Sequence, residues 1–182
     1  VYTFGEEDER FKDLDKYVKS ADRTLSAEEA SKLIELTIKA LQSPAAMERA
    51  NACMELGIVI SHKASIPVLV AVASNPKEYD FVRSDAIQAL ANVPDKEVIP
   101  HLLKIAEQGM KEKNHSVYAS AFYVLHRLLQ LTHVDLKEEP PKEIRSQKLW
   151  EEARGNPEKQ LAIYKALWEW QKDKPIDMRK RV

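Results

Sequence analysis

Histidine and cysteine are the side chains of this sequence best suited to bind a metal, but their spacing does not favour a metal site. A zinc site needs three or four nitrogen, sulfur or oxygen ligands that converge on one point. The chain has one cysteine, Cys53, and its five histidines include no His-x-x-x-His pair. His126 and His133, seven positions apart, share a helix face only if the helix continues past residue 132. We therefore predict no metal and no other cofactor.

Covalent catalysis needs an activated nucleophile, and no motif here supplies one. Acyl transfer uses a serine on a strained turn beside an oxyanion pocket, and the sequence has no Gly-x-Ser-x-Gly. Its four glycines are too sparse for a loop that binds phosphate. Cys53 lies in an apolar helical run beside Met54 and Leu56, which favours a buried thiol over a nucleophile. We predict that the protein is not an enzyme and has no catalytic residue.

The elements that carry these residues repeat along the chain. Residues 49–56 align with 83–90 and 118–125, and their alanines Ala52, Ala86 and Ala121 are 34 and 35 positions apart. Periods of this length are typical of stacked helical hairpins, because one hairpin cannot bury its apolar face alone. We therefore predict an all-α fold, a short right-handed α-solenoid with capping helices at both ends.

Composition agrees with such a fold and excludes several others. Charged residues make up 31% of the 182 residues and hydrophobic residues 44%, which is typical of soluble globular proteins. No stretch approaches the roughly 18 apolar residues of a membrane-spanning helix. The net charge of -1 argues against general nucleic-acid binding, which requires neutralisation of phosphates. Because the sequence begins with Val1 rather than Met, a cleaved export signal and a trimmed start explain it equally, and the compartment stays open.

Helix start and stop signals divide the chain into four parts. Residues 1–25 are acidic with an amphipathic pattern, which predicts a capping helix. Residues 26–131 carry three hairpins, the first beginning with a capping box at Ser26 and Glu29. Residues 132–142 contain Pro140-Pro141 and are predicted to be a linker, with a hinge as an open question. Residues 143–182 are predicted to form a helical pair, with helices near 142–154 and 157–172, and a basic tail.

Within the hairpins, capping residues predict where individual helices begin and end. Ser43-Pro44 is expected to start the second helix of the first hairpin, which runs to about residue 60. The other expected boundaries are N-caps at Asp80 and Asp95 and a C-cap near Gly109.

The repeats resemble HEAT repeats, and more closely the short HEAT-like repeats common in bacterial proteins. The resemblance rests on a proline early in the first helix, Pro67 and Pro100, and on the string Val-Arg-x-x-Ala-x-x-Ala-Leu at 82–90. It covers about residues 30–131, and the middle repeat matches best. It implies a non-catalytic scaffold or adaptor that binds a protein or peptide. The alternative is an enzyme or a nucleic-acid-processing protein on the same scaffold.

The resemblance also bears on Arg49 and Arg83, which stand at equivalent positions, with Tyr118 at the third. HEAT-like DNA glycosylases use a basic groove, but two arginines are few for a phosphate track. HEAT-like deoxyhypusine hydroxylases bind iron through His-Glu pairs, and no histidine here is followed by glutamate. The resemblance implies a ladder in which each arginine binds turn carbonyls or acidic residues of the adjacent repeat. Contact with a ligand or partner is the alternative.

Second helices of stacked hairpins line one continuous face, and residues that interrupt its apolar stripe are candidates for partner contact. Trp150 and Trp168 are expected to pack against the third hairpin. Trp170 lies about 200° around the helix from Trp168, so it faces elsewhere and suits an interface. The candidate residues are Glu48, Arg83, Gln88, Tyr123, Arg127, Gln130 and Trp170.

The partner that we expect is therefore a protein or peptide, whose identity the sequence leaves open. The acidic start and the basic end have opposite charges. Head-to-tail stacking of copies is thus an alternative to the monomer that we expect.

Overall fold

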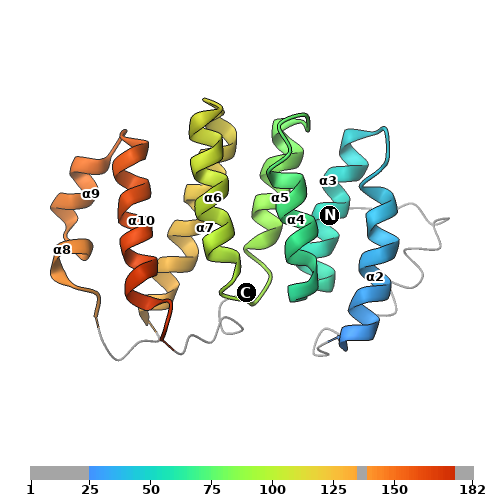
Figure 1. The fold of residues 1–182 in the computed structure, drawn as a ribbon, viewed down its shortest axis with the longest axis horizontal. Coiled ribbons are helices and arrows are strands. Elements are labelled where there is room, and N and C mark those ends of the chain that lie inside the picture. Colours follow the sequence, from blue (N-terminus) through green and yellow to red (C-terminus); the bar gives the residue numbers. More distant parts are fainter. Residues whose placement is uncertain (1–24, 135–138, 175–182) are drawn as a thin grey trace, which may run out of the picture.

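The computed structural model describes residues 25–134 and 139–174. All regular secondary structure in these residues is helical. No strand occurs in these two ranges. Helical hairpins stand side by side along the long axis of the molecule (Figure 1). The predicted all-α solenoid is confirmed. The capping helix predicted within residues 1–25 and the basic tail fall outside the described residues.

The first hairpin consists of α2 (Ala27–Ala40) and α3 (Ala46–Met54), and α3 continues as the π-helix η1 (Glu55–Ile60). The predicted capping box is present. The Oγ of Ser26 accepts from the Glu29 N–H at 3.2 Å, and the Glu29 carboxylate accepts from the Ser26 N–H at 2.9 Å. Two of the backbone donors that every helix leaves free at its start are thereby bonded.

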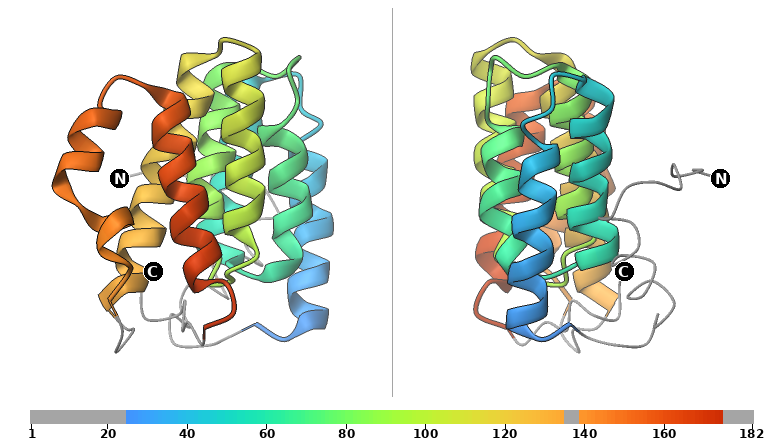
Figure 2. Two further views of the ribbon diagram at one scale, coloured as in Figure 1. Left: turned by 60° about the vertical axis from the view of Figure 1, so that its left-hand side comes forward. Right: turned by 90° about the vertical axis from the view of Figure 1, so that its right-hand side faces the viewer.

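Two more hairpins follow. The short 3₁₀-helix η2 (Lys63–Ser65) leads into α4 (Ile66–Ala73), which pairs with α5 (Asp80–Leu90). The third hairpin pairs α6 (Val98–Lys111) with α7 (His115–Val134), three residues longer than expected. Helices α2, α4 and α6 form one layer, and α3, α5 and α7 form the other (Figure 2). Within the second layer α5 packs against α3 on one side and α7 on the other.

Three helices close the described part of the chain: α8 (Lys142–Arg145), α9 (Gln147–Ala153) and α10 (Pro157–Gln171). The single helix expected near 142–154 is broken at Ser146, whose backbone is extended and whose Oγ accepts from the Leu149 N–H. Asn156 caps α10 as predicted, and the turn before it contains Gly155 at φ 74°. α10 packs on α6 and α7, so it covers the end of the third hairpin.

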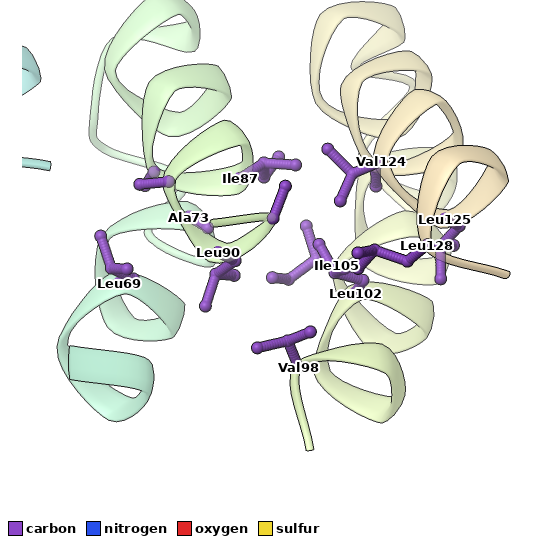
Figure 3. Close-up of a cluster of buried hydrophobic side chains, with 14 of the residues drawn as sticks. Leu69, Ala73, Ile87, Leu90, Val98, Leu102, Ile105, Val124, Leu125 and Leu128 are labelled. Atoms are coloured by element: carbon purple, nitrogen blue, oxygen red, sulfur yellow. The ribbon is translucent and has the colours of Figure 1, made fainter. Parts of the chain in front are cut away.

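Aliphatic side chains from both layers fill the space between the hairpins (Figure 3). Burying each leucine or isoleucine stabilises the fold by about 1.5–3 kcal/mol relative to exposure. Leu69 and Ala73 of α4 and Ile87 and Leu90 of α5 are fully buried. They join Val98, Leu102, Ile105, Val124, Leu125 and Leu128 of the next hairpin in one cluster. The hairpins therefore share one continuous core.

Three of the helix boundaries expected in the second and third hairpins are wrong. The N-cap of α5 is Tyr79 rather than Asp80, because the Asp80 carboxylate instead accepts from the Asn114 amide at 2.6 Å. Asp95 caps a turn, accepting from the Glu97 N–H, and α6 begins later at Val98. Gly109 lies inside α6, where a Cβ would be 3.0 Å from the Tyr118 nitrogen. It allows close approach of α7 and does not end the helix.

Candidate functional site

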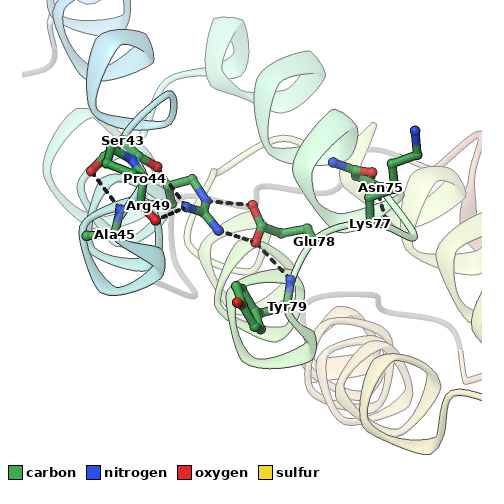
Figure 4. A network of polar contacts seen from close by, with 8 residues as sticks. All are labelled: Ser43, Pro44, Ala45, Arg49, Asn75, Lys77, Glu78 and Tyr79. Atoms are coloured by element: carbon green, nitrogen blue, oxygen red, sulfur yellow. Dashed lines mark hydrogen bonds and ion pairs between the residues drawn. The ribbon is translucent and has the colours of Figure 1, made fainter.

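Arg49 joins the first two hairpins through a network of polar contacts (Figure 4). Its guanidinium donates to both carboxylate oxygens of Glu78, at 2.8 and 2.7 Å. Its Nη1 donates to the carbonyls of Ser43 and Pro44. The expected start of this helix, with Ser43 as N-cap and Pro44 as its first residue, is wrong: α3 begins at Ala46 with Ala45 as its N-cap. The Ser43 and Pro44 carbonyls lie in the preceding turn, where they accept from Arg49. The hydrogen bond from Arg49 lowers the pKa of Glu78 below its usual value.

Arg83 makes the equivalent link between the second and third hairpins. Its Nε donates to the Ala73 carbonyl at 2.9 Å, and its Nη2 lies 2.9 Å from a carboxylate oxygen of Glu112. The predicted arginine ladder, meaning Arg49 and Arg83 with these partners, is confirmed. Arg83 is 2% exposed, so its place among accessible contact residues is wrong.

The outward surface of the second layer carries about one side chain per helical turn from α3 and its continuation η1, from α5 and the turn after it, and from α7. We call this surface the second-helix face. Positions equivalent by the repeat period stand on adjacent helices, so that Met47 corresponds to Phe81 and Ser116. Its members are exposed or half-buried: Met47, Asn51, Met54, Ile58, Phe81, Asp85, Gln88, Asn92, Ser116, Ser120, Tyr123 and Arg127.

Large apolar side chains that are exposed in the described residues gather on this layer. Met47 is 64% exposed, Ile58 58%, Phe81 44% and Tyr123 62%. Tyr79, 62% exposed, immediately precedes α5 and completes the set. The first-helix layer and α8–α10 carry no large hydrophobic side chain that is this exposed, as far as the structure describes them. Exposed apolar groups concentrated on one surface are typical of an interaction site.

A pocket of about 690 Å³ opens on the second-helix face between the N-terminal ends of α5 and α7. Its lining is Glu78, Tyr79, Asp80, Phe81, Ser84, Asp85 and Ser116. The Oγ atoms of Ser84 and Ser120, 3.2 Å apart, link the two helices beside it. A smaller pocket of about 350 Å³ lies between α7 and the start of α10, lined in part by His115, Phe122 and Gly155. The larger pocket combines aromatic rings with carboxylates and is the stronger candidate for binding.

Asp85 in this pocket carries a charge that the free protein does not compensate. Burial raises the pKa of its carboxyl above the usual value. No hydrogen bond or ion pair to the carboxylate occurs within the described ranges. The charged form is therefore less favourable in the folded chain than in the unfolded one.

Asp85→Asn is accordingly expected to leave the free energy of unfolding at pH 7 unchanged or to raise it. Since the folded-state pKa of Asp85 is raised, wild type gains stability relative to the variant as pH falls through that pKa. Urea unfolding of both proteins at pH 7 and pH 3 measures this. A variant clearly less stable than wild type at pH 7 would show that the carboxylate is compensated in the free protein.

The predicted contact residues do not all lie on the second-helix face. Gln88, Tyr123 and Arg127 lie on the second-helix face. Glu48 is exposed at the position where the next repeats bury Val82 and Val117, because no helix precedes α3 in its layer within the described residues. Gln130 belongs to α7, and its side chain falls outside the described residues.

Trp170 lies apart from that face, on α10. It is half-buried, and the Lys174 ammonium lies 3.8 Å from its ring centroid. Trp168 packs against the core, and the Trp150 ring contacts those of His126 and Tyr164 at 5.7 and 5.4 Å. The expected packing of Trp150 against the third hairpin is confirmed.

Sequence reasoning missed most of the apolar residues of the face, and it missed Asp85. The repeat alignment contained a signal for the apolar residues. Met47 and Phe81 occupy equivalent positions, and these positions lie outside the stripe of each helix that is buried. They were passed over because candidates were chosen as polar interruptions of an apolar pattern.

Cys53 is completely buried between the hairpins, as expected. Burial, with a smaller contribution from Asp85, raises the pKa of its thiol to about 12. We expect its reaction with a disulfide reagent at pH 8 to be at least ~100-fold slower in the folded protein than in denaturant, because the thiolate is the reactive form. Absorbance-monitored labelling measures both rates. Equal rates would show that the thiol is accessible.

Two kinds of feature do not occur within residues 25–134 and 139–174. No group of three or more His, Cys, Asp or Glu side chains is placed there to bind a metal ion. None of the helices in the same ranges has both the length and the apolar character needed to cross a membrane.

A scan of protein families matches residues 34–121 to HEAT repeats. Residues 34–121 are therefore HEAT repeats. The match spans the stretch from α2 into α7 and includes both arginines of the ladder. HEAT repeats are commonly scaffolds for protein interactions and are generally non-catalytic. Neither the search of curated proteins nor that of solved structures found a match.

Proposed function

We propose that this HEAT-repeat protein is a non-catalytic scaffold that binds an extended segment of a partner protein along its second-helix face. The concentration of exposed apolar side chains on this layer is the observation that carries the proposal. Covering them releases about 25 cal/mol for each Å² of apolar surface removed from water. A partner that covers Met47, Ile58, Phe81 and Tyr123 together gains this contribution from all three second helices.

Polar groups between the apolar ones suit a peptide in particular. Asn51, Gln88, Asn92 and Ser120 stand on the face and are half-buried. Their amides and hydroxyls can donate to and accept from the backbone of an extended chain, which must retain hydrogen bonds when it leaves water. Aromatic anchors surrounded by hydrogen-bonding side chains are the usual composition of a protein interface.

The arginine ladder supports binding by fixing the spacing of the second helices. Each guanidinium links two successive hairpins, so α3, α5 and α7 are positioned before a partner arrives. A preorganised surface loses less conformational entropy on binding, and affinity increases accordingly.

Affinity for a peptide selected from a displayed random library tests the proposal. Phe81→Ser and Tyr123→Ala are each expected to weaken binding by about tenfold or more, because truncating a central aromatic anchor typically costs 1–2 kcal/mol or above. Val68→Ser is the control, since Val68 is a half-buried apolar residue of α4 in the other layer. Circular dichroism confirms that each variant is folded.

Titration calorimetry on the four proteins gives the comparison. Equal affinity of wild type, Phe81→Ser and Tyr123→Ala would contradict the proposal, as would a selection that yields no peptide. Greater loss in Val68→Ser than in the other two would place binding on the first-helix layer instead.

A further inference from the structure

The pocket between α5 and α7 differs from the rest of the second-helix face in its charge. Three carboxylates, those of Glu78, Asp80 and Asp85, line it, and its lining includes no lysine, arginine or histidine. The net charge of the whole chain is only -1, so this concentration is local. Arg49 pairs with Glu78, so Asp80 and Asp85 supply the net negative charge of the pocket.

The three carboxylates are not equivalent. Glu78 is neutralised by Arg49 in a two-point ion pair, and Asp80 accepts a hydrogen bond from the Asn114 amide. Asp85 accepts no hydrogen bond within the described residues and is partly removed from water. A carboxylate in this state gains most from an incoming cation, because it has no protein partner to lose.

Two aromatic rings line the same pocket as the Asp85 carboxylate. The rings of Tyr79 and Phe81 have centroids 6.0 Å apart and are tilted by 31°. The Arg49 guanidinium already lies 6.0 Å from the Tyr79 ring, so Phe81 is the ring available to an incoming cation. A ring face attracts a cation through its quadrupole, and the ring also covers the aliphatic stem of a long basic side chain.

We propose that this pocket binds a basic side chain of the partner segment, with Asp85 as its anionic contact and Phe81 as its aromatic wall. The inference rests on the proposed function, because it names one part of the partner for the same face. The pocket is open to solvent and is lined by the first turns of α5 and α7, so a side chain can enter it from a peptide that lies on the face. The charge of Asp85 gains nothing from the free fold, which agrees with a role in binding.

An arginine-to-citrulline exchange in the selected peptide tests this pairing, because citrulline has the same shape without the charge. We expect citrulline to weaken binding to wild type about tenfold, and Asp85→Asn to weaken binding of the arginine peptide by a similar factor. In Asp85→Asn the exchange is expected to have little further effect, because both changes remove one interaction. Glu97→Gln, an exposed carboxylate at the start of α6, is the control and is expected to change nothing.

The outcomes separate this inference from the proposed function. Phe81→Ser and Tyr123→Ala could abolish binding while the citrulline exchange and Asp85→Asn do not. In that case the face binds a peptide, but the proposal that the pocket binds a basic side chain is wrong. Equal effects of the exchange on wild type and Asp85→Asn would also overturn the pairing.

A second measurement needs no selected peptide. Titration of ¹⁵N-labelled protein with N-acetyl-arginine amide is expected to shift the amide signals of residues 79–85 and of Ser116, whereas N-acetyl-citrulline amide leaves them in place. Identical shifts with the two compounds, or shifts elsewhere, would contradict the assignment.

Discussion

Gly57→Ala is expected to destabilise the protein by about 3 kcal/mol, among the larger effects of a single added methyl group. A Cβ at this position would lie 2.4 Å from the Ala89 carbonyl oxygen and 2.6 Å from its Cα. Both are backbone atoms of α5 and cannot rotate away, so the first and second hairpins must separate. Separation would also disturb the core cluster that they share. Thermal or urea unfolding monitored by circular dichroism measures the loss.

Two other glycines provide matched comparisons. At Gly109 a Cβ would meet the Tyr118 nitrogen and the Val117 side chain at 3.0 Å, and the valine can adjust in part. Gly155 faces open space but has φ 74°, which costs an alanine about 1 kcal/mol. We expect Gly57→Ala to be the most destabilised of the three alanine variants. A Gly57→Ala protein as stable as Gly109→Ala would show that the hairpins do not approach as closely as described.

Arg83→Met is expected to destabilise the protein by about 3 kcal/mol, which corresponds to a melting temperature lower by ~10 °C. Methionine fills much of the same space but donates no hydrogen bond. The Ala73 carbonyl then loses its side-chain donor, and Glu112 loses the cation that it faces. The buried Ala73 carbonyl left without a donor accounts for most of this loss, because Glu112 is partly exposed and still accepts from the Gln108 amide. Differential scanning calorimetry gives the melting temperature.

The double variant Arg83→Met with Glu112→Gln separates the two contributions. We expect it to recover part of the loss, because the glutamine carries no charge that needs a partner. An Arg83→Met protein that melts with wild type would contradict the arginine ladder as a link between the second and third hairpins.

The solenoid could be predicted because its signals are local and repeated. The alanines Ala52, Ala86 and Ala121 mark the same turn in three helices, and the capping box at Ser26 and Glu29 depends on residues three positions apart. The arginine ladder was expected from the HEAT resemblance, which carries information on contacts between repeats that spacing alone does not hold.

The errors in the helix boundaries share a physical cause. Ser43, Asp80 and Asp95 are good cap residues, but the surrounding turn carbonyls and carboxylates are used by Arg49, Asn114 and a local turn. These other hydrogen bonds, local at Ser43 and Asp95 and tertiary at Asp80, therefore decide where each helix begins. The π-helix η1 has no sequence signal that we can identify. It contains Gly57, whose contact with α5 is tertiary.

The sequence predicted which helices form the candidate surface, but it did not predict which apolar residues are exposed on that surface. Gln88, Tyr123 and Arg127, which were chosen because they interrupt the apolar stripe, lie on this face, and their contact with a partner stays a prediction. Whether an apolar residue such as Ile58 or Phe81 is buried depends on which neighbouring helix covers it. That information appears only when the hairpins are assembled.

The most direct test of the account is a map of the amide signals of ¹⁵N-labelled protein saturated with the selected peptide. We predict that the changes concentrate on α3, α5 and α7, with the largest near Phe81, Asp85 and Tyr123. Changes concentrated on α4 and α6, or around Trp170 on α10, would contradict the claim that the second-helix face is where a partner binds.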